Sequence, residues 1–325
     1  MDLLNSPVFI CGHPKAGTSL ITALLDGHPA VVAYPEETLF FRRFLPTVED
    51  KSRDEQIKVA EQYLIHIFEW NLENPPEHQK NYPDRDYSDI SFEDVREKMI
   101  DTLPDGHVNP KDFLSAAVWA FGKVTGLLDE SSHYWVEKSP YNEFYAETIY
   151  SWWPEAKCIH IVRDPRDNYV SYHRKHPDWT VAGFARNWVR SAQEGLINQD
   201  KFGQDRYSLI RFEDLLTNPE ETLGRIVQFL DISWDEALLK PTRVGDAWRG
   251  NSMFEQKYQA INTDPIGRWK GRLSNYDLAM LQTICGQVMS SVGYEFSELD
   301  LKALSIWERA KLWREKVTKA IRRSK

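Results

Sequence analysis

The stretch that decides the fold is Val8–Ser19, VFICGHPKAGTS. Its first four residues form a short apolar, β-prone run that ends at Gly12. The residues from Thr18 to Leu25 then carry leucines at helical spacing. A buried strand, a tight loop and a helix N-terminus in this order form an anion site, because backbone N–H groups converge there and the helix dipole favours negative charge. The sequence therefore predicts a phosphate-binding loop.

The residue types in this loop also suit a phosphate. Gly12 and Gly17 allow the backbone to approach a ligand without a Cβ in the way. Lys15 adds a mobile positive charge, and Thr18 and Ser19 add hydroxyl donors. The two glycines have the spacing of a Walker A loop, yet Thr18 stands where that motif requires Lys, and no clear magnesium-binding strand follows. A nucleotide kinase is therefore a disfavoured alternative, and an ordinary strand–turn–helix connection is the simplest one.

The composition is that of a globular protein in a reducing compartment. Its 325 residues are enough for one large α/β domain, and 42% of them are hydrophobic. The net charge of −9 argues against general nucleic-acid binding. The cysteines at positions 11, 158 and 285 lie far apart in apolar surroundings, so we expect buried free thiols. The sequence contains no run of 18 apolar residues and no visible signal peptide.

Two adjacent carboxylates, Glu36 and Glu37, follow a predicted second strand at residues 30–34. The carboxyl ends of strands are where α/β sheets bind ligands, so one carboxylate could act as a general base toward an acceptor hydroxyl. Acidic residues also suit the first turn of a helix. From the residues alone these two roles have similar weight, and each can belong to a different member of the pair.

Two further strand ends carry cations. Residues 134–137 predict a short strand that runs into Lys138, which could stabilise charge on a transferring group. Residues 156–162 predict a central strand that ends at Arg163. Ser171 follows in a predicted helix, so a guanidinium and a hydroxyl could converge on one phosphate. The alternatives are a solvated lysine and a salt-bridged helix N-terminus.

A basic, glycine-containing segment lies late in the chain. Residues 244–274 show little apolar periodicity, and loops of this length are usually functional or disordered. Within them, IGRWKGR at residues 266–272 has three cations around Trp269. Arg268 and Lys270 could pair with phosphates while an aromatic or guanidinium face stacks on a base. A solvated loop is the alternative.

Two helical regions flank these motifs. Residues 49–70, 91–103 and 112–127 predict helices, so residues from about 45 to 130 are interpreted as an acceptor-side helical insertion. Residues 299–325 predict a basic amphipathic helix. Its apolar stripe consists of Ile306, Ala310, Trp313, Val317 and Ile321. We expect this stripe to dock on the protein, with peripheral contact to an anionic membrane as the alternative.

Taken together, these motifs resemble those of sulfotransferases that use 3′-phosphoadenosine 5′-phosphosulfate (PAPS). HPKAGTSLI is similar to the 5′-phosphosulfate loop of this family, and RDPRDNYVSY is similar to its 3′-phosphate-binding segment. PEET resembles the acidic segment of tyrosylprotein and heparan-type enzymes, and matching through Thr38 implies that Glu37 is the general base. The EKSP setting of Lys138 and the GRWK segment also resemble family segments.

The resemblance implies a fold, a reaction and a set of residues. The fold is α/β, a P-loop-kinase-like mostly parallel sheet flanked by helices with a helical insertion, in a single domain of residues 1–325. The reaction moves a sulfuryl group from PAPS to a hydroxyl or amine acceptor and releases adenosine 3′,5′-bisphosphate, with no metal. The implied catalytic residues are Glu37, Lys15 and Lys138. The implied donor-binding residues are Lys15, Ala16, Gly17, Thr18, Ser19, Arg163, Ser171, Arg268 and Lys270.

The acceptor and the location are the least constrained by the sequence. We expect a carbohydrate or glycolipid acceptor, from the abundant aromatic residues, the heparan-like Glu and Lys arrangement and the basic helix. A small molecule or a tyrosine is the second interpretation. A kinase-like phosphotransferase or a non-catalytic nucleotide-binding protein is the third. We expect a cytoplasmic enzyme, with contact at the inner membrane face through residues 299–325 as a variant of that expectation.

Overall fold

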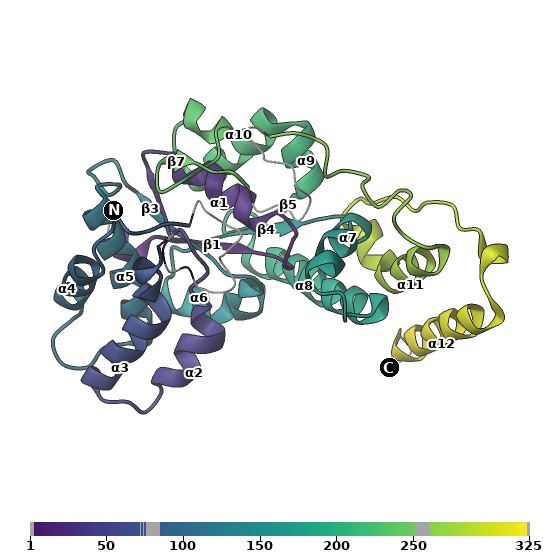
Figure 1. Cartoon of the computed structure of the whole chain (residues 1–325), viewed down its shortest axis with the longest axis horizontal. Helices are drawn as coiled ribbons and strands as arrows, with labels where there is room; N and C mark the ends of the chain where they lie inside the picture. The colour runs from purple at the N-terminus through teal and green to yellow at the C-terminus, as the bar shows by residue number, and fades with distance from the viewer. Residues whose placement is uncertain (1–2, 72, 74, 76–84, 251–260, 324–325) are drawn as a thin grey trace.

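A parallel sheet organises the molecule (Figure 1). The computed structural model describes residues 3–71, 73, 75, 85–250 and 261–323, with side chains up to residue 315. Five strands run in the order β2–β3–β1–β4–β5, and each neighbouring pair is parallel. The strands are β1 (Pro7–Cys11), β2 (Val31–Ala33), β3 (Tyr134–Lys138), β4 (Lys157–Val162) and β5 (Tyr207–Arg211). The predicted α/β class with a mostly parallel sheet is confirmed.

Strand β1 lies at the centre because its residues are apolar on both faces. Phe9 and Cys11 belong to one core cluster, and Val8 and Ile10 belong to another, as the alternation of side chains along a strand requires. β3 and β4 pair with the two edges of β1, with Lys138 opposite Ile10. Because all five strands are parallel, their carboxyl ends meet at one edge, where the loop after β1 lies between the ends of β3 and β4.

Helices cover both faces of the sheet. One face carries α1 (Thr18–Asp26), α9 (Phe212–Thr217) and α10 (Pro219–Leu230). The other carries α5 (Pro110–Thr125) and α6 (Ala146–Trp152). Burial on both faces explains the nearly continuous hydrophobic character of the strands.

The helical insertion begins with α2 (Leu45–Val48) and α3 (Arg53–Ala60) and continues through α4 (Phe92–Thr102) to α5. The helices predicted at 91–103 and 112–127 are confirmed within two residues. Local caps determine where they begin: the Ser91 hydroxyl accepts the N–H of Asp94, and Asn109 starts α5 with a capping box.

The helix predicted at 49–70 is confirmed as a continuous helical run over residues 53–69, but it is not one regular α-helix. α3 ends at Ala60, and a π-helical turn (Glu61–Ile65) and a 3₁₀ turn (His66–Glu69) follow it. The sequence LIHIF at residues 64–68 explains the difference, because four of its five side chains are buried in the core. A regular helix would place successive residues about 100° apart and could not direct all of them inward.

A third group of helices packs beside β4. It consists of α7 (Pro165–Lys175), α8 (Val181–Phe202) and α11 (Asn275–Ser291), which share an apolar core with Val162 of β4. Two residues separate the end of β4 from the start of α7. Pro165 fits the first turn of α7, and the Asp164 side chain accepts a hydrogen bond from the Arg166 amide.

Helix α12 (Ile306–Arg323) lies at one end of the molecule, beyond α11 (Figure 1). It contacts α11 through Leu312, which is buried in the same core cluster as Leu304. An ion pair joins Arg186 of α8 to Glu315. No helix in the described part of the chain is both long and apolar enough to cross a membrane.

The docking predicted for the apolar stripe of this helix is wrong where side chains are described. Ile306 is 83% exposed and Trp313 is 67% exposed, and Ala310 is exposed as well. The physical reason is that Leu312 anchors the helix, which turns the predicted stripe away from the protein. The remaining members of the stripe, Val317 and Ile321, lie outside the described side chains.

The late irregular stretch is partly structured. A short antiparallel hairpin, β6 (Thr242–Arg243) with β7 (Asp246–Ala247), is held to the end of α1, where Asp26 accepts hydrogen bonds from Thr242 Oγ1 and the Gly245 amide. Residues 263–273 form consecutive turns before α11. The part of the predicted loop at residues 251–260 lies outside the described residues.

Candidate active site

The loop after β1 adopts a backbone that its glycines allow. Gly12 and Gly17 have φ angles of +137° and +112°. A Cβ on Gly12 would lie 2.5 Å from the carbonyl oxygen of Ile161, and one on Gly17 would lie 2.2 Å from the ring of Phe212. Lys15, between them, has a left-handed φ of +67°, which is uncommon for a residue with a side chain. The loop therefore lies in close contact with the end of β4 and the start of α9.

The helix N-terminus after this loop carries amides suited to an anion. The first helical hydrogen bonds, donated by residues 20 and 21, are accepted by the carbonyl oxygen of Gly17. The amides of Gly17, Thr18 and Ser19 thus precede the first helical bond, as phosphate-binding amides do. Ala16 differs from the other predicted loop residues, because its amide donates to the carbonyl oxygen of His13 at 3.0 Å.

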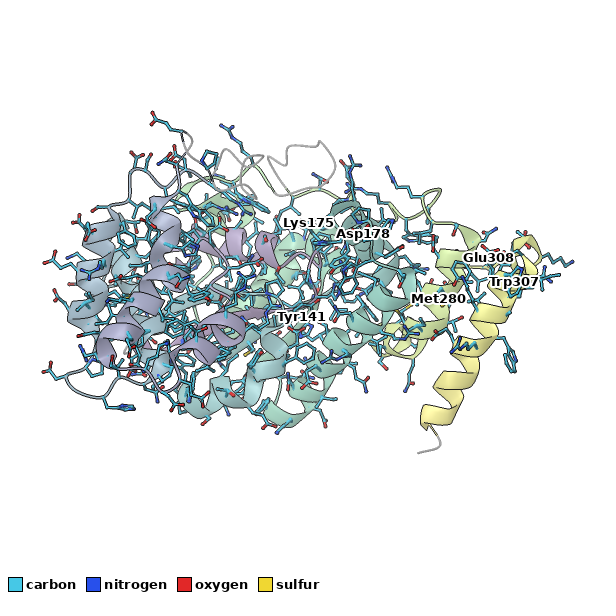
Figure 2. All side chains as sticks on the ribbon, turned by 60° about the horizontal axis from the view of Figure 1, so that its bottom comes forward. Tyr141, Lys175, Asp178, Met280, Trp307 and Glu308 are labelled. Atoms are coloured by element: carbon cyan, nitrogen blue, oxygen red, sulfur yellow. The ribbon has the colours of Figure 1, made fainter. Side chains whose placement is uncertain are left out.

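The three side chains predicted to be catalytic converge beside the loop. Lys138 Nζ lies 2.7 Å from Glu37 Oε1. The pKa of Lys15 is lowered to about 8, first by burial and then by the positive charges of Lys175 and Lys138, with Glu37 acting in the opposite direction. Lys175, the last residue of α7, is labelled in Figure 2. The structure therefore gathers Lys15, Lys138 and Glu37 in one electrostatic cluster.

Glu37 is poised in its ionised form. Its side chain remains 40% exposed, so it can meet a ligand that enters from solvent. Reduced contact with water raises the pKa of Glu37, but the positive charges of Lys138, Arg85 and Lys175 outweigh this effect and leave the pKa below its ordinary value. A carboxylate in this state can accept a proton.

Glu36, its neighbour, is held in a different environment. The side chain is buried and forms ion pairs with Arg243 at 2.9 Å and Arg85 at 3.2 Å. Tyr87 also donates its hydroxyl to Glu36 Oε1 at 2.9 Å. Three donors from two separate segments thus occupy this carboxylate, which makes Glu36 an anchor for the chain after β2.

A buried carboxylate that the sequence analysis did not single out positions Glu37 and Lys138. Glu137 is fully buried at the end of β3 and accepts hydrogen bonds from Thr38 Oγ1 at 2.7 Å, Ser139 Oγ at 2.6 Å and Asn142 Nδ2 at 2.7 Å. Burial raises the pKa of Glu137. These contacts tie the segment of Glu37 to the segment of Lys138. The sequence signal for this role was the acidic residue of the EKSP segment, which is Glu137 itself.

Another buried carboxylate supports the phosphate loop from behind. Glu143 accepts a hydrogen bond from the Gly12 amide at 3.0 Å and another from the Ser191 hydroxyl. Burial raises the pKa of Glu143 to about 7. Asn168 Nδ2 donates to the Pro14 carbonyl oxygen at 2.9 Å, so α7 also holds the loop. Nothing in the local sequence around Glu143 predicted this role.

Arg163 connects the two predicted phosphate sites. Its guanidinium donates to the Lys15 carbonyl oxygen at 3.1 Å, to Ser171 Oγ at 3.3 Å and to the Pro265 carbonyl oxygen at 3.1 Å. The guanidinium also lies 4.7 Å from the centre of the Phe212 ring. The structure therefore places Arg163 and Ser171 together, as predicted, and joins them to the loop and to the late basic segment.

Asp167 fixes that late segment. It accepts the amide hydrogens of Gly267 at 2.7 Å and Trp269 at 2.8 Å, and burial raises its pKa. Arg166 stacks on the Trp269 ring, 4.6 Å from its centre. Arg268 is buried in this arrangement. The late segment and α7 are therefore held together beside Arg163.

The two cations predicted to bind the donor in the late segment differ in their exposure to solvent. Lys270 is exposed to solvent, whereas Arg268 points into the structure. In the described ranges, no three His, Cys, Asp or Glu side chains gather as a metal site would require. A reaction without a metal stays a prediction.

Comparisons with known proteins agree with this geometry. A model of the Sulfotransferase family matches residues 7–236 of the chain. Protein-tyrosine sulfotransferase 1 of Danio rerio is 22% identical over 302 residues, which cover 89% of this chain and 72% of that protein. Omega-hydroxy-beta-dihydromenaquinone-9 sulfotransferase of Mycobacterium bovis is 25% identical over 269 residues, which cover 74% of this chain and 66% of that protein.

A solved structure shows the same fold. The sulfotransferase domain from the curacin biosynthetic pathway superposes with a TM-score of 0.58 at 19% identity, covering 90% of this chain and 99% of that domain. Sheet, loop and clustered cations define an α/β enzyme for the transfer of an anionic group. The family match is more specific, since it extends over more than half of the chain: the protein belongs to the sulfotransferase family and is a PAPS-dependent sulfotransferase. The predicted family and enzyme class are confirmed.

Proposed function

We propose that this enzyme transfers the sulfuryl group of PAPS to an acceptor hydroxyl, with Glu37 as the general base. The observation that carries the proposal is the contrast between the two adjacent glutamates. Glu37 is ionised, partly exposed and paired with Lys138 beside Lys15, whereas Glu36 is buried by two arginines and a tyrosine. Only the former can meet an acceptor.

The residues present fit a donor with two phosphate groups. Lys15 and the amides of residues 17–19 would hold the 5′-phosphosulfate, with Ala16 shaping the turn. Arg163 and Ser171 would hold the 3′-phosphate, and Arg268 and Lys270 would cover the nucleotide. PAPS supplies the activated sulfuryl group, and the chain supplies position and charge.

The mechanism follows from the charges around Glu37. Its carboxylate takes the acceptor proton while the acceptor oxygen bonds to sulfur and the bond to the phosphate oxygen breaks. Lys15 and Lys138 neutralise the charge that develops on the departing phosphate. Lys138 also has a second role. When its ammonium turns from Glu37 to an anionic ligand, the carboxylate loses its main stabilising partner and becomes a stronger base.

The acceptor is proposed at two levels. A hydroxyl is proposed first, with carbohydrate or glycolipid as the expected class and an amine as the variant. A small molecule or a tyrosine is the second candidate, and the protein-tyrosine sulfotransferases among the relatives favour the tyrosine. A single domain, the acceptor-side role of residues 45–130 and a cytoplasmic location also stay predictions. Cell fractionation would test the location.

Calorimetry would test the donor site. We expect adenosine 3′,5′-bisphosphate to bind at least tenfold more tightly than ADP, with or without magnesium. The bisphosphate fills both the 5′ site and the 3′ site, whereas ADP has no 3′-phosphate and fills only the 5′ site. Tight, magnesium-dependent binding of ADP with no preference for the bisphosphate would contradict the assignment.

Substitution of the two glutamates would test the base. With labelled PAPS and a panel of glycan, glycolipid, peptide and phenol acceptors, Glu37→Gln should lower kcat by about 10²- to 10⁴-fold and leave bisphosphate affinity within about threefold. Glu36→Gln is the matched control, with the same loss of charge one residue away. An active Glu37→Gln beside a folded but inactive Glu36→Gln would assign the base to Glu36.

A further inference from the structure

Helix α12 carries an apolar face that the described part of the chain leaves uncovered. Ile306, Trp307 and Trp313 are 83%, 81% and 67% exposed, more than any other large hydrophobic side chain described. The face toward the protein is formed instead by Leu312 and Glu315. Figure 2 shows α12 at the edge of the molecule, with Trp307 on it and Met280 on the neighbouring α11.

The periodicity of the helix places these residues together. With 3.6 residues per turn, Ile306, Ala310 and Trp313 lie on one side of α12, and Trp307 extends that side at its edge. Around the helix, Leu312 lies about 100° or more from Ile306, Ala310 and Trp313. The side of α12 that points away from the protein is therefore mainly apolar, and Arg314 lies on it beside Ala310, about two turns beyond Trp307.

Cations border this apolar face. Arg309 lies between Leu312 and Trp313 around the helix, and its guanidinium donates to the carbonyl oxygens of Leu304 and Lys302. Lys311 lies on the opposite border, and both cations are exposed. Residues 302–325 contain nine Lys or Arg and two Glu, a net charge of +7. Because the whole chain has a net charge of −9, the rest of the chain carries −16.

We propose that α12 rests on an anionic lipid surface, parallel to its plane. Trp and Ile would enter the boundary between headgroups and acyl chains, while Lys and Arg along both borders would reach the headgroups. The charge of +7 complements anionic lipid, and the acidic remainder of the chain would be kept away from it. This inference does not depend on which acceptor the enzyme uses.

A second copy of the chain fits this face less well. Two α12 helices that met through their apolar faces would bring +7 against +7. The acidic surface of another copy could pair with the cations but would leave the indole rings in water. An anionic bilayer satisfies both features at once, because it offers charge and an apolar interior at adjacent depths.

Vesicle sedimentation with the full chain would test the proposal. We expect at least tenfold stronger partitioning to phosphatidylcholine vesicles that contain phosphatidylglycerol than to phosphatidylcholine alone. Raising the salt from about 0.1 M to about 0.5 M should weaken this binding, because it screens the attraction. Equal partitioning to both vesicle types, or no partitioning to either, would overturn the proposal.

Matched variants would assign the binding to α12. Trp307→Ala with Trp313→Ala should lower partitioning at least tenfold, whereas Trp179→Ala with Trp234→Ala removes two exposed tryptophans elsewhere and should not. Lys311→Glu with Arg314→Glu should also lower it, unlike Lys58→Glu with Lys98→Glu. Circular dichroism would confirm folding. Wild-type binding by the α12 variants, or a dimer that the tryptophan variant dissociates, would overturn the proposal, the latter in favour of a second copy.

Discussion

At the scale of single residues, Glu36 and Glu37 show that surroundings separate two identical side chains. Two arginines and a tyrosine satisfy Glu36, while Glu37 has one close partner and access to solvent. Lys15 is a comparable case. Burial among other cations gives it a pKa of about 8, so its charge changes within an accessible pH range.

This titration predicts how donor binding depends on pH. Below about pH 8 Lys15 carries a proton and attracts an anion, and as pH rises through that value the charge is lost. We expect the affinity for adenosine 3′,5′-bisphosphate to fall by about 10- to 100-fold above pH 8, the range of a hydrogen bond to a charged group. Calorimetry between pH 7 and about pH 10 would measure it.

Lys15→Arg is the matched control, because a guanidinium stays protonated throughout this range. Its affinity for the bisphosphate should vary less with pH than that of the wild type. A wild-type affinity that is constant across the same range would show that Lys15 does not bear on the nucleotide.

At the scale of elements, the site depends on contacts between segments that are far apart in sequence. Asp167, in the first turn of α7, holds two amides of the 263–273 turns. Phe212, at the start of α9, lies against Gly17 so closely that no Cβ fits. Each contact predicts the effect of a substitution.

Asp167→Asn should loosen the late segment. An amide offers one acceptor oxygen where two N–H groups now meet a carboxylate, so we expect bisphosphate affinity to fall by about tenfold. Faster hydrogen exchange at the amides of Gly267 and Trp269 would show the cause. Asp264→Asn, an exposed position in the same segment, should change neither quantity.

Gly17→Ala should destabilise the protein, because a Cβ would lie 2.2 Å from the Phe212 ring at a φ of +112°. We expect a loss of about 1–3 kcal/mol in the free energy of unfolding, measured in urea. Gly224→Ala is the opposite control. Gly224 lies in α10 with open space around it, so the same added methyl group should stabilise by about 0.5–1 kcal/mol. Equal effects at both sites would contradict this account.

The sequence is informative about elements and poor at contacts between them. Local apolar patterns predicted β1, the loop and α1, since strand and helix spacing are encoded within a few residues. Glu137, Glu143 and Asp167 were not identified as supports, because each holds a second segment that lies about 100 residues or more away in sequence, at Thr38, Gly12 and Gly267 respectively. Amphipathic spacing revealed the apolar stripe of α12, but it could not tell which way that stripe faces.

At the scale of the whole molecule, the proposed donor site links the sheet, α7 and the late turns through Arg163. A ligand that binds across these parts stabilises the native state only. At one hundred times its dissociation constant, adenosine 3′,5′-bisphosphate should add about 2.7 kcal/mol to the free energy of unfolding. Urea titrations with and without the ligand would measure this increment.

Arg163→Ala should abolish most of that increment and also lower the stability of the free protein, because three hydrogen bonds are lost together. Arg43→Ala, at an exposed position in a second π-helical turn (Phe40–Phe44) that follows β2, should preserve the increment. If Arg163→Ala kept the full increment, the 3′-phosphate site would have to lie elsewhere.

The central position of β1 also has a consequence for protein synthesis. Val8 pairs with Val136 on one side and with Lys157 on the other. A ribosome that adds about 5–20 residues each second needs on the order of ten seconds to produce the first of these partners. Until then neither edge of this apolar strand is paired, although α1 and α5, which cover the two faces of the sheet, have already been synthesised. The strand order therefore leaves both edges of β1 open during this interval, and we expect a chaperone that binds extended apolar segments to recognise it there.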